Sequence, residues 1–113
     1  MQNQPIPDVT RDDVLRIVER DFPPDQQAEV LRELDALGAA AKPRVQLAVL
    51  KLVNGRFGEL EKHLAYARRD WRDVLMWAEY PADAKLSWGI PAEEHHPAYK
   101  TDWEQYQAWL TRP

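Results

Sequence analysis

The sequence predicts an all-α fold, a compact bundle of five to six helices in which two antiparallel helical hairpins surround a buried central helix. Three observations support this fold class. Apolar residues recur at helical spacing through most of the first 80 residues, Pro and Gly separate these stretches, and no segment shows the sustained alternation typical of a strand. The 113 residues, 44% apolar and 30% charged, are enough for one core and one domain.

The domain is expected to have three parts: a flexible N-terminus (1–9), a helical bundle (10–80), and a C-terminal belt with a short final helix (81–113). The first helix should begin after Thr10, because Asp13 three residues later completes a shortened capping box. Pro23 and Pro24 end it near residue 22. A second helix opens at Pro24 or Asp25 and ends before Gly38, which supplies a left-handed C-cap.

The third helix, 43–54, is predicted to be the centre of the bundle. Its apolar positions nearly encircle the helix axis, so other helices must surround it. These positions are Val45, Leu47, Val49, Leu50, Leu52 and Val53. Their burial contributes about 1.5–3 kcal/mol each, on the order of 10 kcal/mol before entropy is subtracted.

After Asn54 and Gly55, two further helices are expected, separated at Asp70. The fourth turns Phe57, Leu60, Leu64 and Ala67 inward. The fifth, about 71–80, should be capped by Asp70 and should turn Trp71, Val74, Leu75, Trp77 and Ala78 to one side, so that it packs largely through its indoles.

Residues 81–100 show no helical period, which favours an extended belt anchored by Leu86, Trp88 and Ile90. A capping box of Thr101 and Glu104 then predicts a short last helix to about Thr111. The twelve residues DWRDVLMWAEYP, 70–81, are echoed by DWEQYQAWLTRP, 102–113. We interpret the echo as one structural solution used twice, because a repeat array needs at least three copies.

Composition excludes several classes of function. There is no cysteine for a disulfide or a thiolate nucleophile, and no apolar run of the roughly 20 residues that cross a bilayer. The start of the chain lacks the features of a secretory signal, so a soluble cytoplasmic protein is expected. Ser87, the one serine, has no Gly-x-Ser-x-Gly context, and no phosphate-binding loop is present. We therefore expect neither an enzyme nor a cofactor.

Two further sites are weak candidates. The segment EEHHP holds Glu93, His95 and His96, and His63 is a conceivable third ligand for a metal or small molecule, although adjacent side chains diverge and a solvated loop is the simpler interpretation. Arg68, Arg69 and Arg72 could contact phosphates. Three arginines make a shallow basic surface, however, and the net charge is −4, so nucleic-acid binding is not favoured.

The stretch VQLAVLKLVNG...LEKHLAYARRDWRDVLMWAEYP, residues 45–81, resembles small all-helical bacterial proteins of unknown function. The segment RVQLAVLKLVNG is also similar to the inner helix of HEAT-type helical repeats. The first resemblance implies a helical fold and no particular activity. The second implies a protein that binds other proteins along a curved surface.

The remaining signal is aromatic. Five Trp and four Tyr are concentrated after residue 65, more than a small helical core needs, and such amphipathic rings are favoured at interfaces. The candidates for a partner surface are Trp88, Tyr99, Trp103, Tyr106 and Trp109. The acidic first hairpin is an alternative, since residues 1–38 carry 9 acidic and 4 basic side chains. We expect a non-enzymatic protein-interaction module, such as an adaptor, an inhibitor or an immunity-type protein, with a protein partner or self-association and no membrane.

Overall fold

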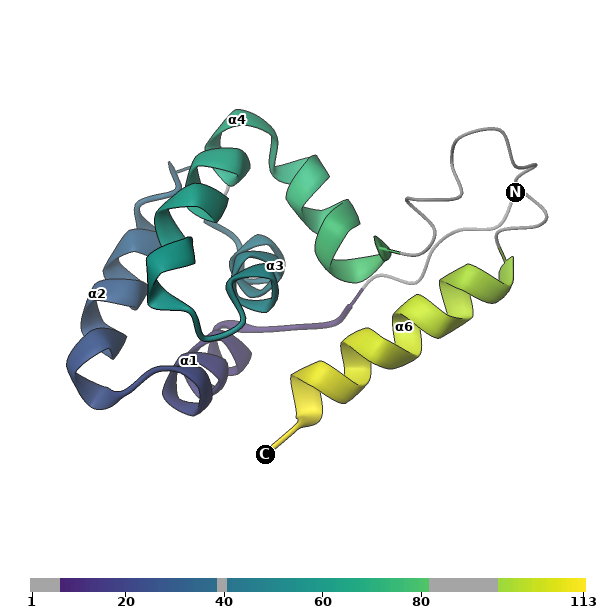
Figure 1. Cartoon of the computed structure of the whole chain (residues 1–113), viewed down its shortest axis with the longest axis horizontal. Coiled ribbons are helices and arrows are strands. Elements are labelled where there is room, and N and C mark those ends of the chain that lie inside the picture. The colour runs from purple at the N-terminus through teal and green to yellow at the C-terminus, as the bar shows by residue number, and fades with distance from the viewer. Residues whose placement is uncertain (1–6, 39–40, 82–95) are drawn as a thin grey trace.

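The computed structural model describes residues 7–38, 41–81 and 96–113. Within these residues the chain is a helical bundle without strands, which confirms the predicted fold class (Figure 1). Its elements are α1 (Arg11–Asp21), α2 (Pro24–Asp35), α3 (Pro43–Val53), the short 3-10 helix η2 (Phe57–Glu59), α4 (Leu60–Glu79) and α6 (His96–Thr111). No helix in the described part of the chain is long and apolar enough to cross a membrane.

The first hairpin begins and turns where the sequence predicts. The Thr10 amide donates to Asp13 Oδ2 at 2.9 Å, which satisfies one of the free N–H groups at the start of α1. Pro24 occupies the first turn of α2, where its missing N–H is not needed. Arg11 joins the two helices through a bidentate contact with Asp35, at 2.7 and 2.9 Å.

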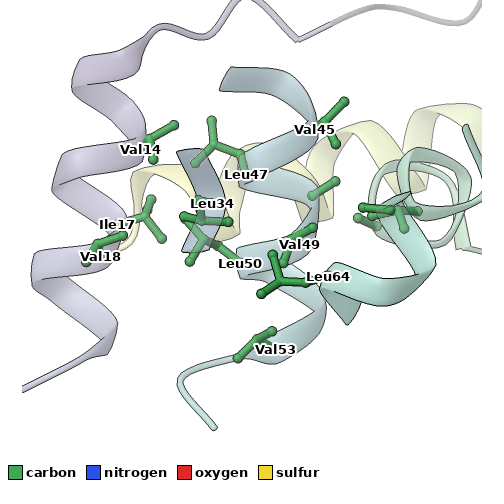
Figure 2. Packing of buried hydrophobic residues seen from close by; sticks show 14 of the residues in the cluster. Val14, Ile17, Val18, Leu34, Val45, Leu47, Val49, Leu50, Val53 and Leu64 are labelled. Atoms are coloured by element: carbon green, nitrogen blue, oxygen red, sulfur yellow. The ribbon is translucent and has the colours of Figure 1, made fainter. Parts of the chain in front are cut away.

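The prediction that α3 is enclosed is confirmed for five of its six apolar positions, while Leu52 is only half-buried because it lies near the end of the helix. Every residue from Val45 to Leu50 is buried, and side chains of α1, α2 and α4 surround α3 (Figure 2). Gln46 is buried as well, although it is polar. Its amide donates to the Leu34 carbonyl at 3.2 Å and to Asp35 Oδ1 at 3.1 Å, so burial leaves its nitrogen satisfied.

The predicted boundary at Asp70 is a kink inside α4. Asp70 has φ −157° and ψ 97°, which is extended backbone, while the residues on either side are helical. Its Oδ1 accepts the Arg72 backbone N–H at 3.1 Å, and Asp70 thereby caps the second half of α4. The two halves point in different directions in Figure 1.

The expected packing of the second half of α4 through its indoles is wrong. Trp71 and Trp77 are 43% and 37% exposed, whereas Val74, Leu75 and Ala78 are buried. Small aliphatic side chains fill the contact, and the larger rings are left at its margins.

The last helix is longer than the sequence suggests. It begins at His96, so the prediction that residues 96–100 belong to an irregular belt and that Thr101 caps the helix is wrong. Pro97 lies in the first turn, where proline is tolerated because its missing N–H is not needed. The rest of the predicted belt, with Trp88, lies outside the described residues.

Two arginines of α1 hold the C-terminal end of α6. Arg16 Nη1 donates to the Leu110 carbonyl at 2.7 Å, and Arg20 Nη1 donates to the Trp109 carbonyl at 2.6 Å and the Arg112 carbonyl at 3.0 Å. The carbonyls at the end of a helix lack most of their helical partners, and positive charge is favourable there. The Trp109 carbonyl also accepts the Arg112 backbone N–H at 3.4 Å. The last helix is therefore fastened to the first.

Candidate functional site: an aromatic surface on α4

The aromatic residues predicted to meet a partner lie mainly in the core. Tyr106 is 1% exposed and Trp109 is 7% exposed, so the expectation that these two rings stay available is wrong. Trp103 is half-buried. The side chains of Trp88 and Tyr99 lie outside the described residues.

Packing explains the burial of the two rings. Tyr106 and Trp109 contact each other with their centroids 5.6 Å apart, and the Arg20 guanidinium lies 5.2 Å from the Trp109 ring. They belong to the same core cluster as the aliphatic residues of α3. The last helix thus uses its aromatic residues to dock on the bundle.

The exposed large apolar side chains are found elsewhere. Among the described residues they are Leu15 on α1 and Trp71, Met76 and Trp77 on α4. Three of the four lie in the second half of α4, directly after the kink. Counting 100° per residue places these three side chains at different angles around the helix, so they do not form one stripe. Trp77 is the one that contacts another ring, that of Tyr66.

A row of rings crosses the kink. The His63 and Tyr66 centroids are 5.8 Å apart, and the Tyr66 and Trp77 centroids are 5.6 Å apart at 80°, an edge-to-face arrangement. The Arg69 guanidinium lies 5.6 Å from the Tyr66 ring. We call His63, Tyr66, Trp77 and Arg69 the aromatic row. It combines flat apolar faces with one cation, which suits aromatic, aliphatic or carboxylate groups.

His63 differs from its neighbours in its environment. Burial lowers the pKa of its imidazole, and nearby Lys62 adds to the effect. Its Nδ1 is buried and has no hydrogen-bond partner among the described residues. Both effects favour the neutral form of the ring, which contributes an apolar edge to the aromatic row.

The three arginines of the proposed nucleic-acid site have different local partners. Arg68 lies 3.4 Å from Glu61, and Arg72 lies 3.1 Å from Asp70, whereas Arg69 stacks on Tyr66. Hydrogen bonding by Arg72 lowers the pKa of the Asp70 carboxyl. Carboxylates beside Arg68 and Arg72 weaken the attraction of this surface for phosphates.

A pocket of about 220 Å³ lies between α2 and the start of α4. It is lined by Glu29, Glu33, Phe57, Leu60 and Glu61. Part of the pocket is formed by the acidic first hairpin, which the sequence analysis names as an alternative surface for a partner. Its lining favours a cationic group over an anionic one.

One ion pair has a buried carboxylate. Arg44 donates to both carboxylate oxygens of Glu79, at 2.9 and 2.7 Å, and Glu79 is 2% exposed. Tyr106 lies nearby. Burial and the Glu79 charge raise the pKa of its phenol, and its hydroxyl has no hydrogen-bond partner among the described residues. The pair neutralises itself and leaves no free nucleophile, so we assign it to stability.

The histidines of the candidate metal site are not brought together in the described part of the structure. His63 lies on α4, while Glu93 and His95 and the side chain of His96 lie outside the described residues. Among the described residues, no group of three His, Cys, Asp or Glu side chains could hold a metal ion. The metal hypothesis keeps His63 as its one described member.

Comparison with protein-family models, with curated proteins and with solved structures finds no match to this chain. The aromatic row is therefore interpreted from its own geometry. One signal in the sequence pointed to it. Counting 100° per residue places Trp77 at the edge of the apolar stripe of its helix, which is the position from which a large ring reaches solvent.

Proposed function

We propose that this protein is a non-enzymatic protein-interaction module that binds its partner through the exposed aromatic residues of α4. The single observation that supports this proposal is the 37% exposure of Trp77, whose ring packs edge-to-face on Tyr66 and brings the aromatic row to the surface. An adaptor or inhibitor needs such a surface and needs no catalytic group. Large rings anchored at one edge lose little entropy when a partner covers the rest.

The surroundings of the row indicate what kind of partner contact it suits. The Tyr66 ring is held between His63 and Trp77, so the row is already ordered before binding. Arg69 has no carboxylate within ion-pairing distance among the described residues, and it can receive one from a partner. A partner segment with an apolar side chain beside a carboxylate fits this surface.

The test is photo-crosslinking in cells that naturally make the protein, with a crosslinker placed at Met76. We expect a discrete crosslinked partner that disappears when Trp77→Ala is introduced in the same chain. The isolated Trp77→Ala protein should keep its free energy of unfolding to within about 1.5 kcal/mol, because the ring is only partly buried.

Leu15→Ala is the matched control, since Leu15 is an exposed apolar residue on a different helix. It should leave the crosslinked product unchanged. Loss of the product in both variants, or its persistence in Trp77→Ala, contradicts a partner site on α4. If Trp77→Ala unfolds the protein, the indole is a core residue and the proposal fails for that reason.

A further inference from the structure

The first half of α4 carries a second surface, which is made of charges. Glu61, Ala65 and Arg68 are all exposed and follow one another at spacings of four and three residues, so they form one stripe along the helix. The Glu61 side chain is 76% exposed and that of Arg68 is 42% exposed. We call these three residues the charge stripe. The stripe has a negative side chain at one end, a small side chain in the middle and a positive side chain at the other end.

The neighbouring helix extends the negative end. Glu29 and Glu33 of α2 line the pocket together with Glu61, and three carboxylates therefore meet at the start of α4. Among the described residues, Glu29 lies 3.7 Å from Arg32 and Glu61 lies 3.4 Å from Arg68. At such distances and exposures ion pairs are weak, and these side chains can exchange partners at little cost.

This arrangement is self-complementary. In a two-fold symmetric pair of antiparallel helices, the negative end of one stripe faces the positive end of the other. Glu61 and Arg68 are seven residues apart, about 10 Å along a helix, and Ala65 lies close to their midpoint. An alanine at the crossing point lets two helices approach closely. The opposite flank carries Lys62, whose charge is offset by Glu59 at 2.8 Å.

We propose that two copies of this chain associate through their charge stripes, with the α4 helices antiparallel and crossing at Ala65. Arg68 of each copy then lies beside the carboxylates of Glu29, Glu33 and Glu61 of the other. The contact goes beyond the partner site proposed above, because Trp77 lies outside the stripe. A dimer of this kind would present two aromatic rows at once.

The test is a charge swap measured by sedimentation velocity over a range of protein concentrations at low salt. The wild-type chain should pass from the 13.2 kDa monomer to twice that mass. Arg68→Glu alone and Glu61→Arg alone should each weaken dimerisation at least tenfold, because like charges then face each other twice. An equimolar mixture of the two variants should restore part of the dimerisation, since positions 61 and 68 again pair opposite charges, while Glu29 and Glu33 still repel the new glutamate at position 68.

The controls separate this inference from the proposed function. Glu19→Arg, an exposed charge reversal on α1, should leave the dimer unchanged, and so should Trp77→Ala. All the reversed residues are exposed, so circular dichroism should show unchanged folding. A wild-type chain that stays monomeric overturns the inference, as does a mixture that stays monomeric while the wild type dimerises. Neither result bears on crosslinking at Met76.

Discussion

The buried ion pair between α3 and α4 offers the sharpest test of the packing. We would replace Arg44 by Met, which keeps an apolar stem of similar length and removes the charge. In the folded protein this leaves the Glu79 carboxylate, 2% exposed, without the guanidinium that binds both of its oxygens. Hydrogen bonding to Glu79 also raises the pKa of Arg44, which favours the charged guanidinium.

The magnitude follows from the exposure of the two partners. Breaking a buried ion pair by removing one member destabilises a protein by about 3–5 kcal/mol, because a buried charge is left uncompensated. The Arg44 side chain is 33% exposed, and water reaches part of the pair, so we expect a value near the lower limit. For a chain of 113 residues, about 3 kcal/mol corresponds to a fall in Tm of about 12 °C.

The assay is urea unfolding followed by tryptophan fluorescence, with the free energy extrapolated to zero denaturant. Arg32→Met is the matched control, because its pair with Glu29 spans 3.7 Å and its side chain is 70% exposed. It should change the free energy of unfolding by less than about 0.5 kcal/mol. The double variant Arg44→Met with Glu79→Met should recover most of the lost stability. A loss below about 1 kcal/mol in Arg44→Met, or a double variant less stable than the single one, refutes this account of the pair.

Three other predictions follow from particular side chains. Tyr106→Ala should lower the free energy of unfolding by about 3–5 kcal/mol, as expected for a buried ring. Tyr106→Phe should leave it unchanged or raise it by up to about 1 kcal/mol, because the buried hydroxyl has no hydrogen-bond partner among the described residues. Urea unfolding of both variants measures the difference. Because the pKa of His63 is lowered in the folded protein, the unfolded chain takes up a proton first as pH falls through the ordinary histidine range, and stability present above that range is lost on acidification. The free energy of unfolding of His63→Gln should fall less over the same pH range. An equal fall in both proteins would contradict the assignment. Arg20→Ala should speed hydrogen exchange of the α6 amides more than that of the α3 amides, and an equal effect on both helices would mean that the contact has no local role.

The sequence was most informative about the hidden parts of the bundle. The apolar circumference of α3 required neighbours on all sides, and the positions of Pro24 and Asp70 marked a helix start and a kink, because backbone chemistry there depends on single residues. The same approach failed at His96, where Pro97 is compatible with the first turn of a helix as well as with its end. The local sequence is compatible with both interpretations, so it could not fix where the last helix begins.

The surface was harder to predict for a physical reason. Periodicity shows which face of a helix is apolar, but it does not show how much of that face a neighbour covers. Trp77 and Trp109 occupy matching places in the two echoed segments, yet one is 37% exposed and the other 7%. The difference arises from contacts distant in sequence, such as that of Arg20 with Trp109, which no local pattern contains.

The fastening of α6 to α1 has a consequence for how the protein is made. Arg20 lies 89 and 92 residues before the two carbonyls it binds, so the ribosome must have released the chain as far as Arg112 before these bonds can form. Until then the nascent polypeptide can fold its first four helices, while the side of α1 that later contacts α6 remains exposed to solvent. Docking of α6 on α1 therefore follows the synthesis of the first helices, and a product that stops before α6 would expose that side of α1 to chaperones and proteases.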